Sequence, residues 1–106
     1  KRKLFLFYKK IFRKNYFFKL VDEPIKTKSN FWLQTILINN KYSNLTQKII
    51  KDLNDKKIHV RPGWELMTNL NYFKDCPKMD ISISKKIYKR IINIPSSSFL
   101  VKSFKK

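Results

Sequence analysis

The chain has 106 residues, of which 25 are Lys or Arg and 7 are Asp or Glu, giving a formal net charge of +18. A chain of this length forms one domain or part of one, with only a modest core. The apolar segment 4–8 is far too short for a membrane span or a signal-peptide core. Cys76 is the only cysteine, which excludes an internal disulfide and favours a cytoplasmic location.

The basic charge has two possible sources. Lys and Arg neutralise phosphates, so a chain this basic could bind nucleic acid or another polyanion. Lys far outnumbers Arg, however, whereas specific phosphate and base recognition favours the planar guanidinium group. The chain also has no Ala and one Gly, and it is rich in Lys, Asn, Ile and Phe, which all have AT-rich codons. A drift in genome composition would enrich Lys at tolerant surface positions without any partner.

The N-terminal part is predicted to contain one helix and one strand. Apolar residues recur at helical spacing across residues 1–14, between Lys and Arg, which indicates an amphipathic helix. The residues on its apolar side are Leu4, Tyr8, Ile11 and Phe12. A short strand over 16–20 follows, and Pro24 then interrupts regular structure before a polar loop over 25–29.

The middle of the chain is predicted to form a strand, a helix and a second strand. Residues 31–38 are aromatic and β-branched and apolar at nearly all positions, so we expect both faces of this strand to be covered. Ser43 or Asn44 would cap the following helix, which ends near 55–57. Its buried stripe would be Leu45, Ile49, Ile50 and Leu53. A strand over 58–60 comes next.

The C-terminal part is predicted to add a helix and a last strand. One helical turn over 64–67 and a loop over 69–78 precede a helix capped by Asp80 or Ser82. This helix would run to about residue 90 and turn three residues to one face, Ile83, Ile87 and Ile91. A strand over 92–94 follows. This order of elements predicts an α+β fold, with a small, mainly antiparallel sheet and helices packed on it.

Four segments carry a family resemblance: 29–33 (SNFWL), 55–67 (DKKIHVRPGWELM), 73–77 (FKDCP) and 90–97 (RIINIPSS). In this order and at these gaps they resemble the SNYWL, KGI-x-x-RP-x-W-x-L-M-H, MF-K-x-C-P and R-x-x-NIPSS motifs of the DegT/StrS sugar aminotransferases. The resemblance covers nearly the whole chain. It is closest to the branch that aminates UDP-linked 4-keto sugars on the route to nonulosonic acids.

The resemblance implies the C-terminal small domain of the aspartate-aminotransferase fold, the type I fold of enzymes that use pyridoxal phosphate. Such enzymes are homodimers with active sites at the subunit boundary. A lysine of their large domain holds the cofactor, which carries an amino group from a donor, usually glutamate, to a nucleotide-linked keto sugar.

None of the motifs of that large domain occurs in the chain, neither the Gly-rich phosphate cup nor the Schiff-base lysine. We therefore expect residues 1–106 to be a fragment that closes over the active site. It would contribute no catalytic, cofactor-binding or metal-binding residue and would be inactive alone.

Three residues are candidates for substrate binding. Arg61 could bind a donor carboxylate or a sugar-nucleotide phosphate, or it could instead form a structural ion pair with Glu65 or Asp80. Trp64 could stack on a sugar or base, or it could plug the seam between two domains. Asn30 could reach the sugar, or it could make only a hydrogen bond within a turn.

Other features are weaker candidates. His59 has no Cys or acidic cluster at ligand spacing, so no metal site is predicted. Cys76 is expected to be a loop thiol, and 96–98 are expected to be polar serines at a strand end, since the glycines of a nucleophile elbow are missing. The basic, aromatic segment 1–19 could bind a nucleic acid strand or an anionic membrane surface. We interpret it instead as a link between two domains whose apolar side faces a missing neighbour.

The chain also departs from the family pattern. Lys57 stands where the family usually has Gly as a left-handed helix cap, which predicts strain of roughly 1 kcal/mol or a shifted helix end. Thr68 replaces a common His and Asn71 a common Pro, which puts the exact sugar in doubt. The chain starts with Lys and ends without a capping signal, so both ends read as cuts and the family's final helix would be absent or truncated at Phe104. The apolar residues then left uncovered would be Phe99, Leu100 and Val101.

Three functions follow from these alternatives. The first is the small domain of a sugar aminotransferase, with its own large domain, a second copy, a nucleotide sugar and an amino-acid donor as partners. The second is a free-standing basic module that binds nucleic acid or an acidic surface. The third is an inert gene remnant.

Overall fold

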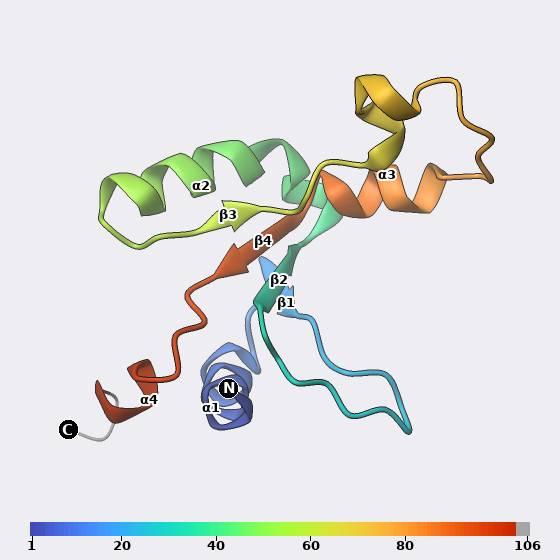
Figure 1. Cartoon of the computed structure of the whole chain (residues 1–106). Helices are drawn as coiled ribbons and strands as arrows, with labels where there is room; N and C mark the ends of the chain where they lie inside the picture. The colour runs from blue at the N-terminus through green and yellow to red at the C-terminus, as the bar shows by residue number, and fades with distance from the viewer. Residues whose placement is uncertain (104–106) are drawn as a thin grey trace.

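A four-stranded antiparallel sheet, in the order β1-β2-β4-β3, forms the centre of the computed structural model, which describes residues 1–103 (Figure 1). The strands are β1 (Phe18–Leu20), β2 (Gln34–Ile38), β3 (Arg61–Pro62) and β4 (Ile91–Ile94). The helices are α1 (Arg2–Phe12), α2 (Thr46–Asp55), α3 (Ser82–Tyr88) and α4 (Leu100–Ser103), with 3₁₀ turns η1 (Asn40–Leu45), η2 (Met67–Asn69) and η3 (Asn71–Phe73). The predicted α+β class, the antiparallel sheet and the order of helices and strands are confirmed, with α4 as an addition.

The two central strands divide their side chains between two unlike faces, because successive residues of a strand point to opposite sides. Ile36 in β2 pairs in register with Ile92 in β4, and both are buried on the face that α1 and α2 cover. Thr35 and Asn93 pair on the opposite face and are only half-buried. The expectation that both faces of β2 would be covered is therefore met on one side only.

Helix α1 packs its apolar side against the sheet of its own chain. Leu4 and Phe5 are 0% and 3% exposed, and the hydroxyl of the buried Tyr8 donates a hydrogen bond to the carbonyl oxygen of Pro95 at 2.9 Å. The expectation that this side faces a missing neighbour is therefore wrong. Ile11, predicted to share the apolar side, is 55% exposed, and Phe5 lies in the core in its place.

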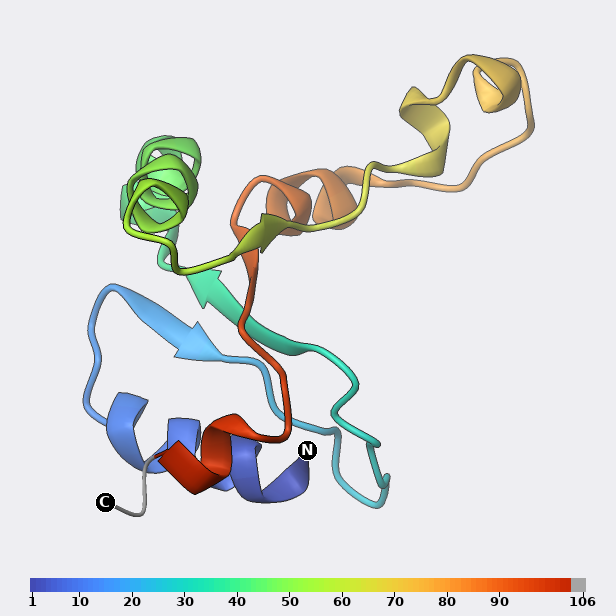
Figure 2. The ribbon, with the colours of Figure 1, turned by 60° about the vertical axis from the view of Figure 1, so that its left-hand side comes forward.

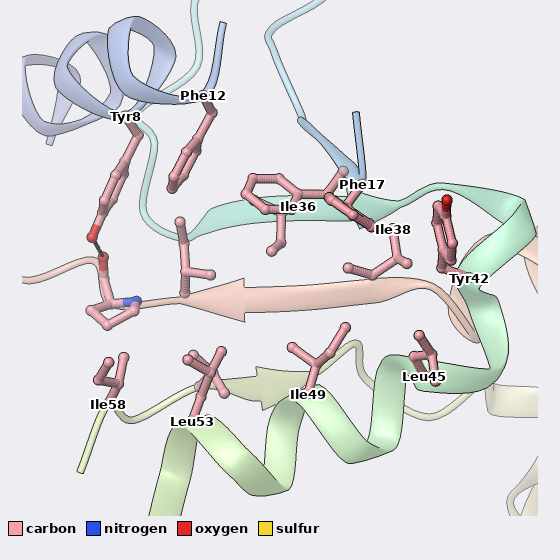
Figure 3. Close-up of a pocket in the computed structure, with 14 residues that line it drawn as sticks. Tyr8, Phe12, Phe17, Ile36, Ile38, Tyr42, Leu45, Ile49, Leu53 and Ile58 are labelled. Carbon is pink, nitrogen blue, oxygen red and sulfur yellow. Dashed lines mark hydrogen bonds between the residues drawn. The ribbon is translucent and has the colours of Figure 1, made fainter. Parts of the chain in front are cut away.

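An apolar cleft of about 480 Å³ stays open between α1 and α2, above the buried face of the sheet (Figure 3). Its lining includes Tyr8, Phe12, Ile36, Ile38, Ile49 and Leu53. At one end of the molecule α4 lies beside α1, and Leu100 and Val101 pack against the core (Figure 2). These two residues were expected to be uncovered, which is wrong, whereas Phe99 is 66% exposed.

Strand boundaries differ from the sequence-based ones. β1 and β2 begin later than predicted, at Phe18 and Gln34. The start of β2 is delayed because Phe31 has a φ of 48°, which lies outside the extended region. β3 lies at 61–62 instead of 58–60, since the chain before it is still closing the end of α2.

The start of α2 also differs from the prediction. Ser43 and Asn44 were the expected caps, but both lie inside the 3₁₀ turn η1 and neither caps α2 with its side chain. The side-chain oxygen of Asn39 instead accepts a hydrogen bond from the N–H of Lys41 at 3.1 Å and so caps η1. Of the predicted stripe, Leu45 is 39% exposed, and the others pack partly buried against the core, namely Ile49, Ile50 and Leu53.

The segment between β3 and α3 extends away from the sheet (Figures 1 and 2). The helical turn predicted over 64–67 lies at η2, and η3 occupies part of the predicted loop. Asp80 accepts a hydrogen bond from the N–H of Ser82 at 3.0 Å, but the N-cap of α3 is Ile81, without a side-chain capping bond, so the predicted cap at Asp80 or Ser82 is wrong. Ile83 and Ile87, which were expected to share one face of this helix, are 69% and 37% exposed, so this part of the face is not covered.

Helix α2 ends in a left-handed residue, Lys57, with a φ of 63°. The N–H of Lys57 donates to the carbonyl of Asn54, and the N–H of Ile58 donates to the carbonyl of Leu53, both at 2.9 Å. These are the two hydrogen bonds of a Schellman motif, which usually places Gly at the left-handed position. The left-handed conformation at Lys57 is confirmed, and the helix end is not shifted.

We predict that Lys57→Gly raises the free energy of unfolding by about 1 kcal/mol, because Gly adopts this conformation without a Cβ clash. Urea unfolding monitored by circular dichroism measures the change. Lys56→Gly is the matched control, since Lys56 has a φ of −81° and Gly there should only lower stability. A Lys57→Gly variant no more stable than the parent would contradict the strain.

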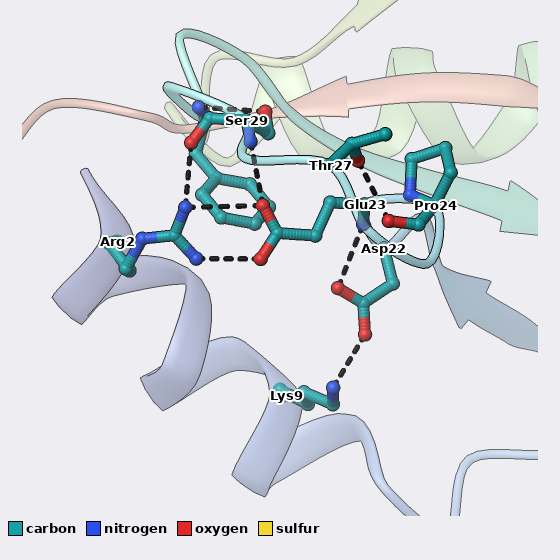
Figure 4. Close-up of polar contacts among 8 residues, drawn as sticks. Arg2, Lys9, Asp22, Glu23, Pro24, Thr27 and Ser29 are labelled. Carbon is teal, nitrogen blue, oxygen red and sulfur yellow. Dashed lines mark hydrogen bonds and ion pairs between the residues drawn. The ribbon is translucent and has the colours of Figure 1, made fainter.

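Two ion pairs attach the loop after β1 to α1 (Figure 4). The guanidinium of Arg2 donates to both carboxylate oxygens of Glu23, at 2.7 and 3.1 Å, and to the carbonyl of Ser29 at 2.8 Å. Glu23 also accepts a hydrogen bond from the N–H of Ser29 at 2.6 Å, and Lys9 pairs with Asp22. The contacts with Arg2 and then Ser29 lower the pKa of Glu23 from 4.5 to about 2.

This pKa predicts how stability depends on pH. Because the pKa of Glu23 is lower in the folded chain, its carboxylate stabilises the fold above about pH 4.5, and the contribution is lost as the pH falls toward about 2. The difference in unfolding midpoint between the parent and Glu23→Gln should therefore shrink over this range. Asp75→Asn, which removes an exposed carboxylate with no ion pair in residues 1–103, is the control and should show no such trend.

Candidate functional site

Polar side chains form a row across the open face of the sheet. Arg61 in β3 pairs in register with Asn93 in β4, and Asn93 pairs with Thr35 in β2. Directly opposite residues of antiparallel strands place their side chains on the same face. The Thr35 hydroxyl donates to the Asn93 side-chain oxygen at 2.8 Å, and the Asn93 amide donates to the carbonyl of Pro62 at 3.2 Å. The row therefore lies opposite α1 and α2.

Arg61 is exposed and makes no ion pair within residues 1–103. Its two expected ion-pair partners are engaged elsewhere. Glu65 accepts a hydrogen bond from the Tyr88 hydroxyl at 2.6 Å, which together with Asn69 lowers the pKa of Glu65, and Asp80 binds Ser82. The guanidinium of Arg61 is therefore available to a ligand or a partner, and its role in substrate binding stays a prediction.

The other two predicted site residues, Asn30 and Trp64, each contact Trp32. The ring of Trp64 is 72% exposed, and its centroid is 6.0 Å from that of Trp32, which is 62% exposed. The side-chain oxygen of Asn30 accepts a hydrogen bond from the N–H of Trp32 at 2.9 Å, so the expected turn bond is present. An exposed Trp64 can stack on a ligand or fill an interface, and both interpretations stay open.

A cavity of about 660 Å³ lies beside Arg61. Its polar lining consists of Lys57, His59, Arg61, Asn93, Ser96 and Ser97. No carboxylate belongs to the lining, so the cavity is basic. Asn93 and Thr35 were not predicted from the sequence, although a polar residue between isoleucines in 91–94 could have indicated that one face of this strand is not core.

The cavity does not fit pyridoxal phosphate. That cofactor needs a lysine for its aldehyde and a carboxylate beside its ring nitrogen. The cavity holds one lysine, Lys57, and no carboxylate. The lysines that do lie beside carboxylates in residues 1–103 are exposed and ion-paired, namely Lys9, Lys48 and Lys51. We therefore derive no step of cofactor chemistry from this part of the chain.

Two further observations concern ligands and membranes. In the part of the chain that the structure describes, no three His, Cys, Asp or Glu side chains are grouped to hold a metal ion. Over the same residues, no helix is long and apolar enough to cross a membrane. Cys76 is exposed in the segment between β3 and α3, as expected for a loop thiol.

Comparison with known proteins places this fold among aminotransferases. The structure of Helicobacter pylori PseC, an aminotransferase involved in the biosynthesis of pseudoaminic acid, matches with a TM-score of 0.79 and 20% sequence identity. The match covers 96% of this chain but 29% of the PseC chain. Residues 1–103 match the DegT/DnrJ/EryC1/StrS aminotransferase family, and the chain belongs to that family. No curated protein matches the chain.

The exposure of Arg61 leads to a stability prediction. Arg61→Gln should change the free energy of unfolding by less than about 0.5 kcal/mol, as for a surface residue without a structural contact. Arg90→Gln is the matched control, because the Arg90 side chain donates to the carbonyl of Ile38 at 2.8 Å and its loss should cost about 1.5 kcal/mol. If Arg61→Gln is as destabilising as Arg90→Gln, Arg61 is structural.

Proposed function

We propose that the chain is the C-terminal small domain of a pyridoxal-phosphate-dependent aminotransferase that acts on a nucleotide-linked keto sugar. The observation that carries the proposal is the family match over residues 1–103, together with the fold shared with PseC, an aminotransferase involved in the biosynthesis of pseudoaminic acid. Pyridoxal phosphate, held by a large domain outside this chain, supplies the transfer of the amino group. Glutamate is the proposed donor, a cytoplasmic homodimer is the proposed assembly, and the isolated chain is inactive.

In this proposal the open sheet face is the side that meets the active site. Arg61 is supported as an anion-binding residue because it is exposed and unpaired within residues 1–103. Trp32 and Trp64 present two large exposed aromatic rings side by side, and such rings can pack against a sugar or against a protein interface. The Thr35–Asn93 hydrogen bond links β2 to β4 and stiffens the open face of the sheet.

The aromatic residues of α1 do not support the alternative function, a basic module that binds nucleic acid. Stacking on single strands needs free aromatic faces. Phe5 and Tyr8 are buried in the core, and Phe12 packs partly buried against it, so these rings are not free. What remains for that alternative is the net charge, to which surface lysines contribute wherever they lie, and the exposed Tyr16 and Phe17 after α1.

The longest reading frame that contains this chain tests the proposal when it is expressed and purified. We expect the visible absorbance of bound pyridoxal phosphate and glutamate-dependent amination of a UDP-linked keto sugar, with neither from residues 1–106 alone. Arg61→Gln in the longer protein should raise KM for the sugar nucleotide by about tenfold and leave the cofactor absorbance unchanged.

Lys56→Gln removes the same charge outside the cavity and is the control for that variant, with KM expected to change by less than about twofold. A longer protein that binds no cofactor would contradict the proposal, and the inert gene remnant would then be the remaining interpretation. Unchanged kinetics in Arg61→Gln would remove Arg61 from the substrate site while leaving the family assignment in place.

A further inference from the structure

Three basic residues alternate along the chain that enters β3. Lys57, His59 and Arg61 all line the 660 Å³ cavity. Val60, which lies between the last two, is 4% exposed and packs into the core on the covered face. His59 and Arg61 are two apart and lie on the side opposite Val60, and the left-handed turn at Lys57 leaves that lysine in the lining of the same cavity.

The rest of the polar lining suits an anion. Ser96 and Ser97 also line the cavity, and neither hydroxyl makes a hydrogen bond within the described residues. Asn93 contributes an amide, and the lining contains no carboxylate. Lys57 and Arg61 form no ion pair in residues 1–103, so their charges are not neutralised by the chain itself.

Lys57 is present at a conformational cost. Its φ of 63° is a left-handed conformation that Gly adopts freely and that costs another residue roughly 1 kcal/mol. Strained residues of this kind concentrate at functional sites. The presence of a lysine at this costly position therefore points to a role for its charge. Because Lys57 lines the cavity, we look for that role there.

The spacing of the basic residues limits the ligand. At about 3.3 Å per residue, the Cα atoms of Lys57 and Arg61 are at most about 13 Å apart along the chain. A ligand that contacts both side chains must carry negative charge along its length, which a diphosphate does and a single carboxylate does not. The guanidinium of Arg61 suits a bidentate phosphate contact, and Lys57 acts as a point charge.

We propose that this cavity binds a diphosphate group, with Lys57 and Arg61 as its charged contacts and His59 with Ser96 and Ser97 as hydrogen-bonding contacts. The inference deepens the proposed function and rests on it for the natural ligand, which would be the diphosphate of a nucleotide sugar. In this proposal, the binding energy that the Lys57 side chain contributes offsets the conformational cost of its positive φ.

Titration of the purified chain with inorganic pyrophosphate tests the site, at low and constant ionic strength. Binding is followed by the amide NMR signals of residues 57–61, 93–94 and 96–97. We expect saturable binding that Lys57→Gly weakens by about fivefold to tenfold, although the same substitution stabilises the fold. Arg61→Gln should weaken binding by at least as much. Lys56→Gly, which removes an equal charge outside the cavity, should change the affinity by less than about twofold.

Three outcomes would overturn the site. Equal losses in Lys56→Gly and Lys57→Gly would mean that pyrophosphate responds to the overall charge of the chain, and binding that does not saturate would mean the same. Glutamate binding as tightly as pyrophosphate would contradict the diphosphate assignment. Because this titration needs neither the cofactor nor a large domain, its failure leaves the aminotransferase proposal standing, and a longer protein that lacks the cofactor leaves the titration unaffected.

Discussion

The pairing of β2 with β4 is the constraint on which the rest of the structure depends. The register that sets Ile36 opposite Ile92 also sets Thr35 opposite Asn93, and through β3 it places Arg61 in the same row. A slip of one residue would exchange the two faces and turn the polar row toward the helices. Burial of isoleucines under α1 and α2 therefore also fixes the side on which ligands and partners can bind.

Two non-glycine residues with a positive φ lie beside the candidate site residues. Phe31, at a φ of 48°, lies between Asn30 and Trp32, and Lys57, at 63°, borders the basic cavity. Phe31 is held by stacking on Phe5, with ring centroids 4.0 Å apart, so packing in the core stabilises a backbone shape that a loop alone would not keep. This arrangement explains how a small sheet with few buried residues can present a defined surface.

The sequence predicted the fold class, the order of the elements and the left-handed conformation at Lys57, because these depend on local pattern and on motifs in fixed order. It did not predict what covers α1, since an amphipathic pattern shows which side is apolar but not which surface packs on it. It also missed the row that contains Thr35 and Asn93. That row follows from strand register, which is set by contacts between residues far apart in the chain.

Cross-strand proton contacts in the NMR spectrum of the chain test the central claim most directly, since they report the register itself. The structure predicts contacts between Thr35 and Asn93 and between Asn93 and Arg61, with none from the Thr35 methyl group to the α2 side chains Ile49 and Leu53 that line the apolar cleft. Contacts that pair Thr35 with Ile92 or Ile94 instead would shift the register by one residue. They would place the polar row under the helices, and the site described on the open face would not exist.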